Sequence, residues 1–423
     1  MKYTKTTLRN GLRIVTAPTK GTETATVLVL VGVGSRYENE EQAGLSHFIE
    51  HMMFKGTEKR PNTLAIAEEL DSIGGEYNAF TSKVKTGYWA KVDAKHADVA
   101  LDVVSDMFLN SKLDGKEIER EKGTILQELA MYEDIPMRSV EDTFERLLYG
   151  RQDLGREIIG YKKTIKNFKR KDFTDYMGKY YVANDTVICV AGKIDEKKVI
   201  SKLRKYFSKL NGQEKPEFKK VDEKQNSPKL KIKNKKTDQT HIALGVRGYH
   251  DNHSDKYAQS LLSVILGGNM SSRMFISIRE RQGLAYYVRT STERYQDAGY
   301  LVTNSGVEHK NLGKTIESIL KEYRKIATKK VDEKELQKAK DFLKGKMVMG
   351  LESSDEVASF LAGQEVMKDK ILSPAQIYKK IEKVTTDDIL RVAKDIFVSE
   401  KLNLAVIGPH KDGKRFENIL NKF

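Results

Sequence analysis

Cysteine is nearly absent from this chain of 423 residues, because Cys189 is its only example. A single cysteine excludes an internal disulfide framework, and its place in the apolar run 186–191 predicts a small core residue. This favours a reducing compartment, so we expect a cytoplasmic protein. Long hydrophobic runs are also missing. Since no stretch of 18 or more apolar residues occurs, we expect no segment to span a membrane.

The N-terminus lacks the continuous apolar stretch that a secretory signal peptide requires. Asn10 and Gly11 instead predict a hairpin turn between two strands. Motifs for nucleic acid recognition are missing as well, although the formal net charge is +15. Because 75 basic residues are interleaved with 60 acidic ones, we interpret the charge as a lysine-rich surface and expect no nucleic acid partner.

Residues 44–55 (GLSHFIEHMMFK) carry histidine and glutamate in a pattern typical of a metal-binding helix. At about 100° per residue, His47, Glu50 and His51 share one helix face. The opposite face is apolar at the spacing of a core stripe, with Leu45, Phe48, Ile49, Met52 and Met53. We expect the helix to bury the apolar face, present the polar one and stop at Gly56.

Two imidazoles one helical turn apart can hold a zinc ion, whose catalytic sites use three protein ligands and a water. Glu50 would lie beside that water as the general base. His-x-x-Glu-His is the inverted order of the more familiar zinc-peptidase motif. The third ligand should come from a predicted helix at residues 117–133, where several glutamates share one face. Spacing alone does not decide between Glu121 and Glu128.

These segments resemble the inverted zinc peptidases of the pitrilysin family, which includes insulysin, the mitochondrial processing peptidase and small bacterial processing-protease-like enzymes. The shared pattern is HFIEHMMFKGT, then GGEYNAFTSKVKTGYWAKV, then the glutamate helix. The resemblance covers nearly the whole chain. It implies one zinc ion per chain, held by His47, His51 and Glu128, with Glu50 as base. Glu128 follows His51 at the family's separation for its third ligand, and Glu121 matches the family's supporting carboxylate.

Residues 76–92 are typical of two strands with a short connection. The resemblance implies that Asn78, Ala79, Phe80 and Thr81 bind the substrate peptide as an added strand. Backbone hydrogen bonds would then supply the affinity and tolerate many sequences. From the residues alone, an ordinary paired strand is the alternative.

Residues 271–290 (SSRMFISIRERQGLAYYVRT) place Arg279 and Tyr286 seven positions apart, or two helical turns if a helix continued through Gly283. The segment resembles the family's F-x-x-[IL]-R-x-x-x-x-L-x-Y motif. That resemblance implies that Arg279 and Tyr286 bind the substrate backbone and help to stabilise the tetrahedral intermediate. A phenol O–H that donates to an oxyanion suits this role.

The sequence repeats itself at a constant offset, so that residues 165–207 match residues 381–423 without a gap. Matched pairs include Phe168 with Val384, Asp172 with Asp388, Val182 with Val398, Gly192 with Gly408 and Phe207 with Phe423. An offset of about half the chain indicates a duplicated domain rather than a solenoid. At the same offset the two motif histidines fall on Ser263 and Gly267, so only the first copy is expected to hold zinc.

Residues 211–228 (NGQEKPEFKKVDEKQNSP) are charged and have no apolar periodicity, which predicts a linker. We therefore expect a zinc-binding catalytic domain at 1–210 and a homologous domain at 229–423, which lacks metal ligands and carries the Arg/Tyr motif. Strand-like runs and amphipathic helices are mixed without regular β-α alternation. This favours an α+β fold with two largely antiparallel sheets flanked by helices.

The motif and the resemblance together predict a zinc metalloendopeptidase that hydrolyses peptides or unfolded polypeptides within a closed chamber. The resemblance to four-domain relatives such as insulysin also implies a homodimer, with a heterodimer with a related subunit as the alternative. Two rival functions are a non-catalytic scaffold, as in respiratory-complex core subunits, and a basic nucleic-acid-binding protein. The intact motif argues against the first, and the second predicts salt-dependent binding.

Overall fold

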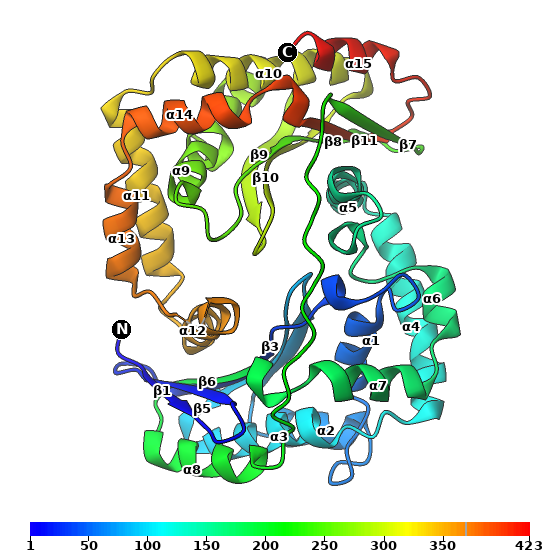
Figure 1. Cartoon of the computed structure of the whole chain (residues 1–423), viewed down its shortest axis with the longest axis vertical. Helices are drawn as coiled ribbons and strands as arrows, with labels where there is room; N and C mark the ends of the chain where they lie inside the picture. The colour runs from blue at the N-terminus through cyan, green and yellow to red at the C-terminus, as the bar shows by residue number, and fades with distance from the viewer. Residues whose placement is uncertain (369) are drawn as a thin grey trace. The chain divides into compact units, whose positions relative to one another are not determined.

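The computed structural model describes residues 1–368 and 370–423, which form two compact units (Figure 1). Unit 1 comprises Met1–Leu129, Arg156–Lys219 and Met347–Pro374. Unit 2 comprises Ala130–Gly155, Lys220–Lys346 and Ala375–Phe423. Each unit holds one sheet flanked by helices, so the predicted α+β fold is confirmed. Among the described residues, we find no helix with the length and apolar content needed to cross a membrane.

Unit 1 is built on a six-stranded sheet in the order β1-β2-β6-β3-β5-β4. The strands are β1 (Thr4–Thr7), β2 (Arg13–Pro18), β3 (Thr24–Val31), β4 (Glu76–Thr81), β5 (Thr86–Asp93) and β6 (Thr186–Gly192). All neighbours are antiparallel except β2 and β6. The predicted hairpin joins β1 to β2, and Gly11 adopts φ +91° in its turn. Strand β4 lies at an edge of the sheet, and the backbone groups of an edge strand can pair with a further strand.

Helix α12 (Ser354–Lys368) covers one face of this sheet, while α3 (Ala97–Asn110) covers the other (Figure 1). Alternate side chains of β2, β3 and β6 pack against α12 in a core that includes Val15, Leu28, Leu30, Cys189, Ala358, Leu361 and Ala362. On the opposite face, Phe108 of α3 stacks near Tyr181 at a ring separation of 5.6 Å. Cys189 is fully buried, as predicted, and burial raises the pKa of its thiol.

Unit 2 repeats this architecture with a five-stranded sheet in the order β7-β11-β8-β10-β9. Its strands are β7 (Lys229–Asn234), β8 (Thr240–Arg247), β9 (Ala285–Arg294), β10 (Gly299–Val307) and β11 (Leu402–Gly408). Strand β7 begins at Lys229, which the sequence repeat matches to Arg13, the first residue of β2. Strand β11 begins at Leu402, which the repeat matches to Thr186, the first residue of β6. Apart from the additional edge strand β1 of the first sheet, the two strand orders correspond, so the fold has the duplication that the sequence predicts.

The two halves of the sequence exchange one helix. Helices α5 (Pro136–Tyr149) and α12 occupy equivalent places in the repeat, yet α5 packs on β8 and β11 of unit 2 and α12 packs on β3 and β6 of unit 1. Polar contacts fasten each one: Glu145 accepts hydrogen bonds from two tyrosines, and Ser354 bonds to two threonines. The compact units therefore differ from the contiguous divisions 1–210 and 229–423 that the repeat suggests.

Residues 211–228, the predicted linker, contain no helix or strand, and the two units divide within them between Lys219 and Lys220. The remaining α-helices of unit 1 are α1 (Leu45–Met52), α2 (Thr63–Asp71), α6 (Lys162–Asn167), α7 (Arg170–Tyr180) and α8 (Glu196–Phe207). Those of unit 2 are α9 (Lys256–Gly267), α10 (Leu312–Thr328), α11 (Glu333–Met349), α13 (Pro374–Glu382), α14 (Thr386–Ile396) and α15 (Lys414–Asn421). Of these, α11 belongs to unit 2 only up to Lys346, and α13 belongs to it only from Ala375. Helix α4 (Gly115–Glu133) contributes its residues up to Leu129 to unit 1.

Candidate metal centre

Helix α1 is the predicted motif helix, and its apolar face is fully buried as expected. The helix ends at Met52, so the prediction that it stops at Gly56 is wrong. The chain leaves the helix through a turn in which the amides of Phe54 and Lys55 bond to the carbonyls of His51 and Met52. Gly56 instead adopts φ +123° in the following loop, where a Cβ atom would lie 2.7 Å from a backbone oxygen.

The start of α1 depends on Gly44 and Glu38. Gly44 adopts φ +97°, and a Cβ atom there would lie 2.6 Å from the carbonyl oxygen of Ile159, so only glycine fits. Glycine offers no capping side chain, and Glu38 supplies one from the preceding loop. Its carboxylate accepts hydrogen bonds from the amides of Gly44 at 2.8 Å and Ser46 at 2.7 Å. Burial raises the pKa of Glu38 to about 7 despite these two donors.

The side chains of His47, His51 and Glu128 converge on one point in unit 1. Oε2 of Glu128 lies 3.6 Å from Nε2 of His47 and 3.4 Å from Nε2 of His51. Two ligand atoms at about 2.0–2.1 Å from a tetrahedral zinc ion lie roughly 3.3–3.4 Å apart. The separations and the donor types therefore fit a zinc ion bound by two imidazoles and one carboxylate.

Glu121 contacts the other ring nitrogen of His51, Nδ1. Its Oε1 atom is 2.9 Å from Nδ1 of His51, and its Oε2 atom is 2.6 Å from Nζ of Lys55. Burial raises the pKa of Glu121, but the bonds from His51 and Lys55 lower it by more, so the pKa falls below its usual value. The geometry thus distinguishes the two glutamates that spacing left open, because Glu128 faces both Nε2 atoms and Glu121 faces Nδ1 of His51. Nδ1 of His47 is buried without a hydrogen-bond partner in the described part of the chain.

Glu50 is half-buried on the same helix face as the two histidines. Its Oε2 atom accepts a hydrogen bond from the hydroxyl of Thr81, at 2.5 Å. Neither this bond nor the Glu38 cap was predicted from the sequence. An N-cap glycine without a polar side chain is the one sequence signal that could have prompted a search for an outside acceptor such as Glu38.

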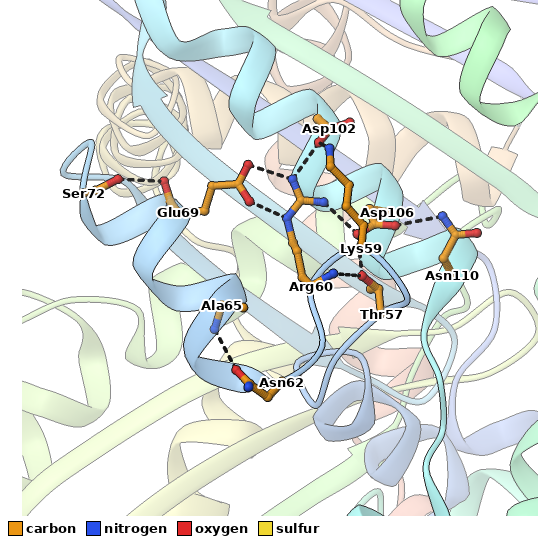
Figure 2. A network of polar contacts seen from close by, with 10 residues as sticks. All are labelled: Thr57, Lys59, Arg60, Asn62, Ala65, Glu69, Ser72, Asp102, Asp106 and Asn110. Atoms are coloured by element: carbon orange, nitrogen blue, oxygen red, sulfur yellow. Dashed lines mark hydrogen bonds and ion pairs between the residues drawn. The ribbon is translucent and has the colours of Figure 1, made fainter.

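The loop after α1 is held by a buried arginine (Figure 2). The guanidinium of Arg60, with 2 % of its side chain exposed, donates to Glu69, Asp102 and Asp106 at 2.6–2.8 Å. Thr57 also donates to Asp106, at 2.6 Å. Because Glu69 belongs to α2 and the two aspartates belong to α3, this cluster ties the loop that follows the motif helix to both helices.

The residues expected to bind substrate lie on the edge strand β4, which pairs with β5 as predicted. Phe80 packs against the core under α12, while Asn78 is exposed. Oδ1 of Asn78 accepts a hydrogen bond from the amide of Ala79 at 2.8 Å. An edge amide of β4 is therefore covered by a side chain of the same strand, which hinders unwanted strand pairing.

Arg279 and Tyr286 meet in unit 2, although not through helical spacing. Arg279 belongs to the π-helical turn Phe275–Glu280, the chain then turns at Gly283 with φ +59°, and Tyr286 lies on β9. The guanidinium carbon of Arg279 lies 5.4 Å from the centre of the Tyr286 ring. Tyr286 is 76 % exposed.

Within the described ranges, His47, His51 and Glu128 are the only group of three or more side chains with metal-ready spacing. In the repeat, α9 takes the place of α1, and Ser263 and Gly267 stand at the positions of the two histidines. Of the other histidines, His309 and His410 both bond to the hydroxyl of Thr240 at 2.8 Å, as structural residues do.

Comparison with known proteins finds relatives of both halves of the chain. Residues 13–162 match the insulinase family (peptidase family M16), and residues 167–343 match the peptidase M16 inactive domain. The uncharacterized zinc protease YmxG of Bacillus subtilis is 36 % identical over 409 residues, covering 95 % of this chain and 97 % of that protein. An uncharacterized zinc protease of Streptomyces coelicolor is 32 % identical over 414 residues, covering 96 % of this chain and 90 % of its own.

Solved structures agree on the fold. The crystal structure of a protease from Helicobacter pylori superposes with a TM-score of 0.90 at 24 % identity, over 96 % of this chain and 99 % of the other. A peptidase M16 inactive domain from Pseudomonas fluorescens superposes with a TM-score of 0.88 at 16 % identity, over 97 % of this chain and 99 % of the other. Because the two bacterial zinc proteases share about a third of their residues with this chain along nearly its whole length, the chain belongs to peptidase family M16.

Proposed function

We propose that this chain is a zinc-dependent endopeptidase that hydrolyses peptide bonds of peptides or unfolded polypeptides. The observation that carries the proposal is the convergence of two imidazole Nε2 atoms on one carboxylate oxygen at 3.6 Å and 3.4 Å, on the helix that also presents Glu50. His47, His51 and Glu128 would hold the ion. When bound, zinc would act as a Lewis acid and bring the pKa of a water molecule toward neutrality.

Glu50 is the proposed general base. Its carboxylate would take a proton from the attacking water as the new C–O bond forms at the carbonyl carbon of the substrate. The same carboxyl group would return that proton to the leaving nitrogen as the C–N bond breaks. Glu121 would keep His51 in the tautomer that offers Nε2, and Arg279 with Tyr286 would bind the substrate backbone and the developing oxyanion.

The direct test uses the purified protein. Elemental analysis should find one zinc ion per chain, and a quenched peptide library should be cleaved. A chelator should abolish cleavage, and added zinc should restore it. Protein without stoichiometric zinc would overturn the metal site. Protein that holds zinc but cleaves no peptide would instead point to the non-catalytic scaffold function.

We further propose that substrates enter a closed chamber formed by a homodimer, in which Arg279 and Tyr286 of one copy serve the zinc site of the other. The support is the family resemblance, because four-domain relatives such as insulysin build one site from two parts, and residues proposed for both parts occur here, the zinc ligands in unit 1 and the Arg/Tyr pair in unit 2. A chamber predicts that an unfolded polypeptide is cut while its folded form is spared. A cytoplasmic location, proposed from the single cysteine, is tested by cell fractionation.

Mixing two inactive variants tests the shared site. Glu50→Gln and Tyr286→Phe protomers, each nearly inactive alone, should recover activity when combined. In the mixed dimer, one site pairs Glu50 of the Tyr286→Phe chain with Tyr286 of the Glu50→Gln chain. Absence of recovery, with mixed dimers verified by mass, would reject sharing between copies.

A further inference from the structure

Thr81 is the last residue of β4, and its hydroxyl reaches across to the motif helix. Its Oγ1 atom donates a hydrogen bond to Oε2 of Glu50 over 2.5 Å. The two residues lie 31 positions apart in the sequence and both are half-buried. A hydroxyl has one hydrogen to donate, and a carboxylate accepts it more strongly than a neutral oxygen does.

The backbone of Thr81 is held in place by the turn that follows it. Ser82 donates through its amide to the carbonyl of Lys85 at 2.9 Å, and the amide of Lys85 returns a bond to Oγ of Ser82 at 3.1 Å. The carbonyl of Ser82 also accepts a bond from the amide of Ser35, at 3.2 Å. Thr81 therefore projects from a hydrogen-bonded hairpin rather than from a loose loop.

Thr81 also lies on the side of β4 that faces α1. Side chains alternate along a strand, so Tyr77 and Thr81 share a face and Phe80 takes the opposite one. Phe80 packs under α12, whereas the ring of Tyr77 lies 6.4 Å from that of Phe54, just after α1. Strand β4 thus approaches the motif helix region at two points, and one of these points is Glu50 itself.

We propose that Thr81 is a positioning residue for the general base. This inference rests on the proposed function and assigns Thr81 a role beyond contact with substrate. Its hydroxyl donates a hydrogen bond to Oε2 of Glu50 and restricts the rotation of the Glu50 side chain. Oε1 of Glu50 is then the oxygen that takes the proton from the attacking water. Because Thr81 belongs to the strand proposed to pair with substrate, the same hairpin sets the position of the bound peptide and of the base.

The test compares Thr81→Val, which keeps the shape but loses the hydroxyl, with Thr81→Ser, which keeps the hydroxyl. The wild-type protein is assayed first for zinc content and peptide cleavage, so that failure of the proposed function is seen separately. Thr81→Val should keep its zinc and its KM within about twofold, while kcat falls roughly 10- to 100-fold, as expected for a lost hydrogen bond to a charged group. Thr81→Ser should keep most of the wild-type kcat.

Three results would overturn the proposal. A kcat of Thr81→Val within about twofold of wild type would show that the hydroxyl is dispensable. A serine variant as slow as the valine variant would make the methyl group responsible. If Thr81→Val does not fold, Thr81→Ala replaces it, and loss of the fold or of zinc in both hydroxyl-free variants would make the role of Thr81 structural.

Discussion

Oε1 of Glu121 lies 2.9 Å from Nδ1 of His51, on the side of the imidazole away from Glu128. An ionised carboxylate in this position accepts the Nδ1–H bond and leaves Nε2 with a lone pair for a metal. The lowered pKa of Glu121 keeps the carboxylate ionised at neutral pH. Glu121 therefore sets both the tautomer and the orientation of one proposed ligand.

Replacement of Glu121 should weaken the metal site without removing a ligand. Glu121→Gln loses the charge that pairs with Lys55 and accepts the His51 bond less strongly, so we expect zinc affinity to fall about 10- to 100-fold. Competition with a chromogenic chelator measures the change. The matched control is Glu117→Gln on the same helix, where the glutamate pairs with exposed Arg120. Equal zinc affinity in both variants would contradict this role.

Replacement of Glu50 should separate proton transfer from metal binding. Glu50→Gln keeps the size of the side chain but cannot accept the proton of the water, so turnover should fall by about 10²-fold or more. Zinc content should stay at the wild-type value. His51→Ala is the contrasting variant and should lose both zinc and activity. Near-normal turnover in Glu50→Gln would mean that another group is the base.

Zinc affinity should depend on pH through His51. Burial lowers the pKa of this histidine, but in the metal-free protein the bonds to Glu121 and Glu128 more than compensate and raise the pKa to about 9. Zinc must then displace a proton at neutral pH, so its apparent affinity should rise about tenfold per pH unit toward pH 9 and level off above it. Chelator competition at pH 7, 8 and 9 measures this, and an affinity that stays flat would contradict it.

The same pKa gives the opposite trend for stability without metal. The folded-state pKa of His51, about 9, lies above its ordinary value of 6.5. The protonated histidine therefore contributes its full stability below about pH 6.5, and this contribution is lost as the pH rises through about 9. Thermal unfolding of the zinc-free protein across this range should show the decline in unit 1.

Replacement of Glu38 should loosen the motif helix. In Glu38→Gln the amide nitrogen cannot accept a hydrogen bond, so one of the two buried amides at the start of α1 loses its partner. We expect a loss of about 1–3 kcal/mol. Calorimetry measures this loss of unfolding free energy. The relevant unfolding transition is the one whose temperature rises when zinc is added, because only the unit that binds zinc is stabilised by the ion. Glu41→Gln, a change at an exposed neighbour, is the control and should leave that transition unchanged.

Features that depend on local periodicity were predictable from the sequence. The spacing of Leu45, Phe48 and Ile49 predicts the buried face of α1, and that prediction is confirmed. The constant offset of the repeat anticipates the equivalent strand orders of the two sheets. Within the candidate site, the two histidines follow from the motif, while the distinction between Glu121 and Glu128 came from the family resemblance and then from distances.

Features that depend on distant contacts were not predictable in this way. The bond from Thr81 to Glu50 joins a strand end to a helix, and no repeat or spacing links those two positions. Arg279 and Tyr286 meet across a turn at Gly283, where a helical pattern would have given the wrong path. The exchange of α5 and α12 is hidden for the same reason, because both copies carry an equivalent helix and the pattern does not say which sheet each one covers.

The exchange of α12 sets the order in which the chain can mature on the ribosome. Strands β1 to β3 emerge first, but the helix that buries Leu28 and Cys189 ends at residue 368. At about 5–20 residues per second, that helix follows β3 by roughly 15 to 70 seconds of synthesis. During this interval one apolar face of the first sheet has no cover of its own. We therefore expect the first sheet, which is complete at Gly192, to be a target for chaperones that bind exposed apolar surface until α12 is made.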